Sequence, residues 1–566
     1  MNYRYLYLFV AIMGSIMVSL PLQAQTLPQD TAINRVVVVE QQYNPEIRDA
    51  QKINVLPQVQ EPTVAHNTVK YDTSVSPSNS IPTDIIPVFT GTEEREKAKR
   101  GYARAGYGNY GNLDVKGNYL FLSEKDKVNL SVSADGTNGK LTLPIDYGNG
   151  YEWKSRYYQT RAGLDYEHRF KQSVLELGGH GQVSDFNSLP TSLDWKQQFV
   201  LGDVHLGLHS FGETLPLRFQ LETNLLYFSR KNDRLRLSDN TINNKETIGR
   251  TKANIAAGIS DMQFVGIAFK MNNVFYDNPD FSNYTTLDMN PYYELNNEGW
   301  KLHAGINVDV SLGYGKGLQL SPDLLIQRTF SDSYVLYAKA SGGRQINDFR
   351  QLEVASPYAE LTSQEPIANT YEQINATLGF KASPVSGFWF NVYGGYQSLK
   401  DDLYQWGSLI LYDVDDSFSL QTVSFEQAET FDLYVGIRFA YAYKDRFNLS
   451  ASGNGYAWGT TNSDWVGIDY EPALYFKPAY SIDLSADIQP YRGLTFRLGY
   501  QYIAREKMGN EEIAAINNLS LGATYRLYKG LSVYVRGGNL LNRQYQYYYM
   551  YPTEGIHVLG GVSVRF

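Results

Sequence analysis

The sequence predicts an all-β fold, namely a transmembrane outer-membrane β-barrel of about 22 antiparallel strands (range 18–22). Three observations lead to this prediction. Apolar and polar residues alternate with period two through most of the chain after residue 101. Short connections alternate with longer ones along the same region. Aromatic residues make up 14% of the sequence and 46 residues are tyrosine, whose apolar ring and polar hydroxyl suit strands and the water–lipid boundary.

The composition excludes several classes of protein. The 566 residues include 50 Lys and Arg against 59 Asp and Glu, so the net charge of −9 disfavours a nucleic-acid partner, which needs an electropositive face. The chain has no cysteine, which excludes thiol catalysis, Cys-ligated zinc and disulfides. We find no Gly-x-Ser-x-Gly elbow and no Gly-rich phosphate loop, so we expect no enzyme activity and no cofactor.

The first 24 residues have the pattern of a secretory signal peptide. A basic start at Arg4 precedes an apolar stretch, and Ala24 provides a small residue for cleavage. The alternative is a single membrane anchor, but the apolar stretch is short for a hydrocarbon core of roughly 30 Å. We therefore expect residues 1–24 to be removed during export.

Residues 25–100 are predicted to form a proline-rich, extended periplasmic arm. Seven prolines in these 76 residues oppose both helix and central strand. One segment has enough β propensity to add as a strand to the sheet of a partner, and we call it the valine segment: Val36, Val37, Val38, Val39 and Glu40. A short strand that pairs locally, or a disordered tail, is an equal alternative.

Residues 101–566 are predicted to form the barrel. In the stretch 494–502 the even positions are apolar or aromatic, while Arg497 and Gln501 fall on the opposite face. An arginine facing lipid at mid-membrane is costly, so we expect these polar residues to face a wet lumen. Neither a soluble sandwich nor a propeller explains the pattern, because no fixed repeat is present and the number of strands is large.

The connections give the strand count. Ten tight turns alternate with eleven longer links, which implies about 22 strands with both ends of the barrel on the tight-turn side. The short turns are expected on the periplasmic side and the longer loops outside. An empty lumen of this width would leak, so inward loops, the arm or a partner chain must fill it.

The end of the chain carries the most specific pattern. Residues 537–545 read Gly-Gly-Asn-Leu-Leu-Asn-Arg-Gln-Tyr, and the chain ends in a strand with Gly561, Val564 and Phe566. This resembles TonB-dependent outer-membrane receptors, in which a strand runs into an Asn-Leu-x-Asn/Asp-x-x-Tyr loop. The final residues are similar to the signal that the barrel-assembly machinery recognises. The family also carries a plug domain inside the barrel, for which residues 25–100 are too few and too rich in proline.

The resemblance implies a function and partners. A barrel of this type would take up a ligand across the cell outer membrane of a Gram-negative bacterium, surrounded by outer-membrane lipid. The valine segment is similar to the stretch that pairs with TonB, so TonB or another periplasmic or outer-membrane protein is the expected partner. The alternative is a structural barrel that transports nothing and whose arm recruits partners to an outer-membrane complex.

Candidate site residues are few. An aromatic loop is a candidate ligand platform, or else part of the aromatic girdle at the headgroups: Tyr545, Tyr547, Tyr548, Tyr549 and Tyr551. His205 and His209 share a strand face with Asp203, but about 13 Å separates positions i and i+4 of a strand, so we expect polar filler and no metal site. An acidic outer loop is predicted to be solvated, with calcium binding as the alternative: Asp401, Asp402, Asp413, Asp415 and Asp416.

Overall fold

The computed structural model describes most of residues 99–566. The described range has gaps at 143–151, 189–195, 212–215, 235–240, 298, 332, 360, 362–366, 412–418, 445, 461–463, 466–467, 470–473, 507–512 and 550. The predicted signal peptide, all but the last two residues of the predicted arm, and the valine segment lie outside the described residues, as do Asp413, Asp415 and Asp416.

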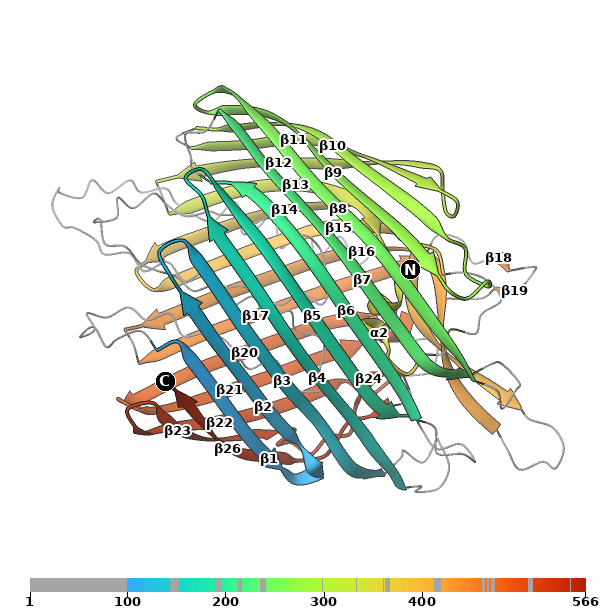
Figure 1. Cartoon of the computed structure of the whole chain (residues 1–566), viewed down its shortest axis with the longest axis vertical. Coiled ribbons are helices and arrows are strands. Elements are labelled where there is room, and N and C mark those ends of the chain that lie inside the picture. Colours follow the sequence, from blue (N-terminus) through green and yellow to red (C-terminus); the bar gives the residue numbers. More distant parts are fainter. Residues whose placement is uncertain are drawn as a thin grey trace, which may run out of the picture. The chain divides into compact units, whose positions relative to one another are not determined.

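The described residues form one closed antiparallel sheet of 22 strands, which confirms the predicted fold. Each strand pairs with its neighbour in the chain, and β1 pairs with both β2 and β26, which closes the barrel. Figure 1 shows this closure as the blue first strand beside the dark red last strands. Closure removes the free edges that would leave unpaired N–H and C=O groups in lipid.

The barrel strands have the following bounds: β1 Gly101–Gly108, β2 Leu113–Leu122, β3 Asp126–Thr142, β4 Glu152–Arg169, β5 Ser173–Asn187, β6 Lys196–Ser210, β7 Leu217–Arg234, β8 Thr241–Ser260, β9 Gln263–Tyr276, β10 Tyr284–Asn296, β11 Trp300–Leu312, β12 Leu318–Phe330, β13 Tyr334–Gln345, β14 Thr370–Val385, β15 Phe388–Leu411, β16 Ser419–Tyr443, β17 Phe447–Thr460, β20 Pro478–Tyr491, β21 Leu494–Arg505, β22 Ile516–Tyr528, β23 Leu531–Gly538 and β26 His557–Arg565. The tight turns and the longer links alternate along this list as predicted, and the first and last strands begin and end on the tight-turn side.

The remaining elements lie in the longer links: η1 Asn109–Gly111, α2 Phe349–Ala355, β18 Asp464–Trp465, β19 Ile468–Asp469, η3 Leu474–Phe476, β24 Gln546–Tyr548 and β25 Tyr551–Pro552. In the described ranges, no helix is long and apolar enough to cross a membrane.

The two faces of the wall differ as the alternation predicts. Phe496 and Leu498 of β21 are 38% and 42% exposed on the outer face. Between them, Arg497 points inward and its Nε donates to Asp487 Oδ1 on β20 at 2.8 Å. A charge pair of this kind is stable in a wet lumen, whereas the same arginine facing lipid would be costly.

The closing seam depends on a pair of glycines. Gly106 of β1 lies opposite Gly561 of β26, and the side chain of Tyr534 on β23 lies across both. The Tyr534 hydroxyl donates to Asp114 Oδ2 at 3.2 Å, and Asp114 also forms an ion pair with Arg104 at 2.8 Å. The missing side chains at the two glycines therefore create the space for an aromatic ring that ties the last strands to the first.

Gly561→Ala is expected to destabilise the seam. A Cβ at this position would lie 2.6 Å from both the Gly106 Cα and the Tyr534 hydroxyl, so backbone or ring must move. We expect a loss of about 1–3 kcal/mol, measured by urea unfolding of the purified barrel in detergent. Gly560→Ala is the matched control, because its Cβ would meet only the Tyr534 carbonyl oxygen at 3.8 Å. Equal effects of the two substitutions would contradict this account of the seam.

Candidate functional site at the loop end of the barrel

The described residues of the link between β13 and β14, namely 346–359, 361 and 367–369, turn into the barrel, and we call them the α2 loop. Its two ends are tied together, since Asn347 N–H donates to Asn369 Oδ1 at 3.0 Å and Asn347 Nδ2 donates to the Ala368 carbonyl at 2.7 Å. Ala368 is also fixed to the wall, because it exchanges two hydrogen bonds of 2.8 Å with the side chain of Gln427 on β16.

Helix α2 is anchored at its beginning. Asp348 is the N-cap residue, and its Oδ1 accepts from the Gln351 N–H at 2.8 Å, which satisfies one of the open donors of the first turn. The Asp348 carboxylate also pairs with Arg250 of β8 at 3.3 Å, and the Phe349 N–H donates to Glu246 Oε2 of β8 at 3.0 Å. The helix is therefore held against one strand of the wall.

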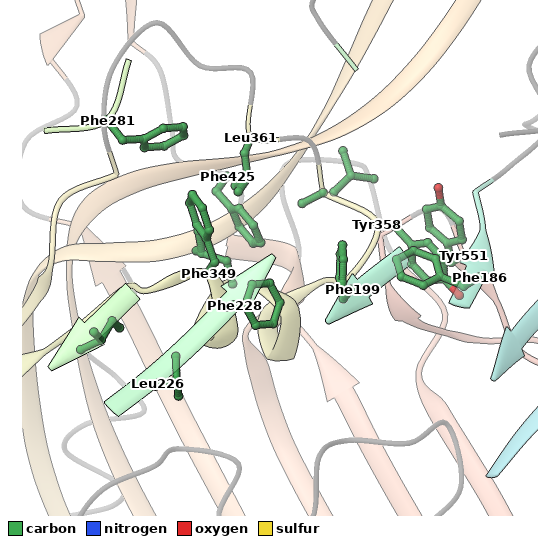
Figure 2. Close-up of a cluster of buried hydrophobic side chains, with 14 of the residues drawn as sticks. Phe186, Phe199, Leu226, Phe228, Phe281, Phe349, Tyr358, Leu361, Phe425 and Tyr551 are labelled. Carbon is green, nitrogen blue, oxygen red and sulfur yellow. The ribbon is translucent and has the colours of Figure 1, made fainter. Parts of the chain in front are cut away.

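An apolar cluster fills the space beneath α2. Phe349 and Leu352 are each only 1% exposed, and the ring of Phe349 lies 5.1 Å from Tyr276 and 5.3 Å from Phe281. Figure 2 shows Phe349, Phe425 and Phe228 in this cluster, with Phe199 further to the right. The cluster joins the α2 loop to the inner face of the wall and comprises Leu141, Trp153, Phe186, Phe199, Leu226, Phe228, Ile248, Val274, Phe281, Tyr284, Phe349, Leu352, Tyr358, Ala359, Leu361, Val423, Phe425 and Tyr551.

The α2 loop joins a strand of the wall to the hairpin of β15 and β16. The Ala359 carbonyl accepts from Arg230 Nη2 of β7 at 2.7 Å, while Ala359 also forms an isolated bridge with Val423 of β16. The pairing of β16 with β17 begins at Thr430, so Val423 lies in the β15–β16 hairpin beyond that register. One residue of the loop therefore connects β7 to this hairpin.

The link between β23 and β26, residues 539–556, is the second inward segment, and we call it the last loop. Asn539 is 1% exposed and has a positive φ of 45°, a conformation that asparagine tolerates better than most residues. Its amide donates 2.7 Å hydrogen bonds to the carbonyls of Arg543 and Glu554. Asn542 Oδ1 accepts from the Ile556 N–H at 3.2 Å. The two asparagines of the sequence motif thus shape the loop by capping its backbone.

The tyrosines of the last loop face inward. The Tyr547 hydroxyl donates to Gln501 Oε1 on the lumen side of β21 at 3.2 Å, and Tyr545 packs edge-on against Tyr547 with 5.4 Å between the ring centroids. Tyr548, Tyr549 and Tyr551 pack on the apolar cluster. These five tyrosines therefore do not form a lipid-facing girdle, and their role as a ligand platform stays a prediction.

The two inward segments meet at a tyrosine pair. Tyr358 of the α2 loop stacks on Tyr551 with 3.6 Å between ring centroids and 6° between planes. Figure 2 shows this pair next to Phe186 of β5. Gln405 of β15 also links the segments, because its Nε2 donates to the Ala355 carbonyl at 3.0 Å and its Oε1 accepts from the Tyr549 N–H at 3.0 Å. The two loops form one unit, which we call the loop gate.

A buried carboxyl lies at the centre of the loop gate. Glu353 of α2 is 7% exposed, and its Oε1 lies 3.4 Å from both Gln182 Nε2 and Ser184 Oγ of β5. Burial raises the pKa of Glu353 to about 7, although the positive charges of Arg230 and Arg161 act in the opposite direction. The carboxyl is thus neutral in part at physiological pH while the loop is docked.

Of the five acidic residues predicted to lie in a solvated outer loop, the structure describes two, Asp401 and Asp402, and both form ion pairs. Asp402 is 6% exposed, accepts from Thr430 Oγ1 at 2.6 Å and forms an ion pair with Lys477 at 2.6 Å. Asp401 pairs with Lys316 at 3.1 Å. For Asp402 the expectation of a solvated carboxylate is wrong, because the link between η3 and β20 brings Lys477 to it.

The histidine pair considered in the sequence is not brought together. His209 lies 4.0 Å from Glu176 of β5, further along the strand from His205, as the strand spacing predicts. Asp203 instead approaches His180 of β5, with 3.3 Å between carboxylate and imidazole. Sequence reasoning missed His180, because cross-strand register determines which side chains meet and no periodicity along one strand reports it.

Tyr358→Ala is expected to release the α2 loop. The substitution removes a ring that packs on Tyr551, Phe186 and Trp153, and loss of a buried aromatic costs about 3–5 kcal/mol. We expect hydrogen exchange of the amides of residues 349–359 to become at least about 100-fold faster. Tyr358→Phe, which keeps the ring, is the control and should exchange at nearly the wild-type rate. Unchanged exchange in the alanine variant would show that the ring pair does not hold the loop.

Comparison with known proteins identifies the class of this fold. No protein-family model matches the sequence, and no curated protein sequence matches it. Solved structures that match include the copper transporter OprC, with 13% identity and a TM-score of 0.59 over 83% of this chain and 80% of that one. The siderophore receptor PirA from Acinetobacter baumannii matches with 9% identity and a TM-score of 0.63 over 84% and 81%.

The FrpB iron transporter from Neisseria meningitidis (F3-3 variant) is similar at the same level, with 10% identity and a TM-score of 0.63 over 83% of this chain and 82% of that one. The fold is therefore that of the 22-strand barrel of TonB-dependent outer-membrane receptors. At these identities the likeness extends to the fold alone.

Proposed function

We propose that this protein is an outer-membrane uptake receptor of the TonB-dependent type, located in the outer membrane of a Gram-negative bacterium. The observation that carries the proposal is the loop gate. A wide lumen with a polar wall holds at its loop end two segments that belong to the chain's own outer loops. A barrel with only a structural role has no need of a polar passage through the membrane.

The arrangement supports a route for a ligand. A ligand captured at the outer loops would contact the tyrosines of the last loop in place of Tyr358. Separation of Tyr358 from Tyr551 would then release the α2 loop from the last loop. Below it, the lumen wall carries charge pairs of both signs, such as Arg497 with Asp487, which provide a hydrated path. The valine segment would add as a strand to TonB or another periplasmic partner.

The test is uptake by cells that produce either the wild-type chain or a variant lacking residues 36–40. The similar copper transporter OprC and siderophore receptor PirA suggest two probes, ⁶⁴Cu and ⁵⁵Fe complexed with a siderophore. We expect accumulation of at least one probe by the wild type and loss of that accumulation in the variant. Normal uptake by the variant would contradict coupling through the valine segment. If neither probe accumulates and the deletion only dissociates an outer-membrane complex, the structural-subunit alternative replaces the proposal.

A further inference from the structure

A cluster of two histidines and two aspartates lies on the lumen wall just below the loop gate. It comprises Asp165 of β4, His180 of β5, and Asp203 and His205 of β6. Nitrogen or oxygen atoms of His180, Asp203 and His205 all lie within 4.8 Å of one another. His180 is two residues along β5 from Gln182, which contacts Glu353 of the α2 loop. A species that passed the loop gate would therefore meet this cluster.

The imidazole of His180 has a fixed orientation. Its Nε2 lies 3.0 Å from Asp165 Oδ1, and Asp165 in turn accepts from Asn129 Nδ2 at 3.3 Å. The other ring nitrogen, Nδ1, lies 3.3 Å from Asp203 Oδ1. Histidines that bind metals commonly donate their second N–H to a carboxylate, which sets the tautomer and the orientation of the ring. Asp165 would hold the proton on Nε2, and a bound metal ion would displace the proton that Nδ1 directs at Asp203.

Asp203 lies between the two imidazoles. Its Oδ2 is 3.7 Å from His205 Nδ1 and accepts from Asn224 Nδ2 at 3.0 Å. The rings of His180 and His205 are nearly parallel, with 5.3 Å between centroids and 12° between planes. Three donor atoms from two adjacent strands therefore surround one small volume, and all three side chains retain access to the lumen.

Two glycines on the neighbouring strands provide the space for these rings. A Cβ at Gly178 would overlap the His205 imidazole and lie 2.8 Å from Asp165 Oδ1. A Cβ at Gly163 would overlap the His180 ring and lie 2.9 Å from Ser131 Oγ. Each imidazole thus occupies the position of a missing side chain on the next strand. The space at Gly163 and Gly178 is an observation separate from the distances between the three ligand atoms. It allows both rings to lie close to the wall beside Asp203.

We propose that His180, Asp203 and His205 bind one divalent transition-metal ion such as Zn²⁺, with Asp165 as the positioning residue for His180. Two imidazoles and one carboxylate suit borderline cations, and three protein ligands leave coordination positions open for water or an incoming ligand. Asp165 and Asp203 provide negative charge that attracts a cation. The positive charge of Arg350 on α2 acts on Asp203 and therefore weakens this attraction. The site goes beyond the proposed uptake function, because it assigns a metal-binding role to the lumen wall.

The test is Zn²⁺ binding to the full-length protein, purified in detergent without a histidine tag and stripped of metal with a chelator. Isothermal titration should show one bound Zn²⁺ per chain. His180→Ala and His205→Ala should each weaken binding at least tenfold, and Asp165→Asn should weaken it less. His209→Ala is the matched control, since it removes a histidine from the same face of β6 and should leave binding unchanged. Co²⁺ in place of Zn²⁺ should give visible absorption that is lost in the His180 variant.

Two results would overturn the site. One is the absence of Zn²⁺ binding by the wild type, which would leave His180 as an imidazole held between two carboxylates. The other is binding that persists unchanged in the double variant of His180 and His205, which would place the metal elsewhere. Heat-modifiable mobility on gels checks that each variant forms the barrel. Uptake and conductance measurements do not depend on Zn²⁺ binding, so failure of the uptake proposal is distinguishable from failure of this one.

Discussion

Replacement of residues 348–368 by a short Gly-Ser linker is expected to convert a closed barrel into an open pore. The variant loses Phe349, Leu352 and Tyr358 from the apolar cluster, together with Ala359, which links Arg230 of β7 to Val423 of β16. In planar bilayers we expect the wild type to conduct rarely and the variant to show a large, steady conductance. The lumen of a 22-strand barrel is wide enough to conduct ions as an aqueous channel when no segment fills it.

Two further proteins make this measurement decisive. Gln351→Ala changes a residue of the same helix that is not part of the apolar cluster, and it should stay closed. A truncation that removes residues 25–98 separates the role of the arm from that of the loop. If the linker variant conducts only after the arm is also removed, the arm closes the pore and the assignment of the loop gate is wrong.

Closure of the loop gate is expected to weaken as the pH rises from about 4.5 to about 7, because docking buries Glu353. Burial raises the pKa of Glu353 from 4.5 to about 7, so its proton is retained more strongly when the loop is docked. The stabilisation is fully present below pH 4.5 and is lost as the pH rises through the pKa of the docked state. With about 1.4 kcal/mol per pKa unit, the docked state loses about 2–3 kcal/mol across this range and little more above it.

Glu353→Gln provides the test of this pH dependence. The amide is nearly isosteric and remains neutral, so closure should become insensitive to pH, with conductance at pH 7.5 as low as at pH 5. The wild type should open at least about 30-fold more often at pH 7.5 than at pH 5. Arg230, Arg161 and Arg350 surround Glu353 and oppose the rise of its pKa, and they remain charged throughout the range. Equal pH profiles for the two proteins would assign any pH response to another group.

Much of the fold follows from local pattern. Alternation in stretches such as 494–502 distinguishes the lipid face from the lumen face, and the spacing of turns and links predicts 22 strands with both ends on the tight-turn side. The reason is physical, since each strand must present apolar side chains to lipid and satisfy its backbone in a closed sheet. These requirements act on every strand separately, so they appear in the sequence.

The candidate site follows from the sequence only in part. The motif around Asn539 predicts a shaped loop, and the tyrosines at 545–551 indicate an aromatic surface, but neither reveals the partner, which is Tyr358 in a link nearly 200 residues earlier. The α2 loop contains one helix of seven residues, too short for its periodicity to be recognised. Its burial depends on residues from strands that are far apart in the sequence.

The sequence by itself therefore determined the barrel, its strand number, its two faces and the alternation of tight turns with longer links. Only the tertiary structure decided that two loops fold inward and meet, that Glu353 is buried, and that His180 rather than His209 lies beside Asp203. Strand periodicity and turn chemistry are local properties of the chain. Register between strands and closure of the sheet bring together residues that are distant in sequence, and no local pattern records these contacts.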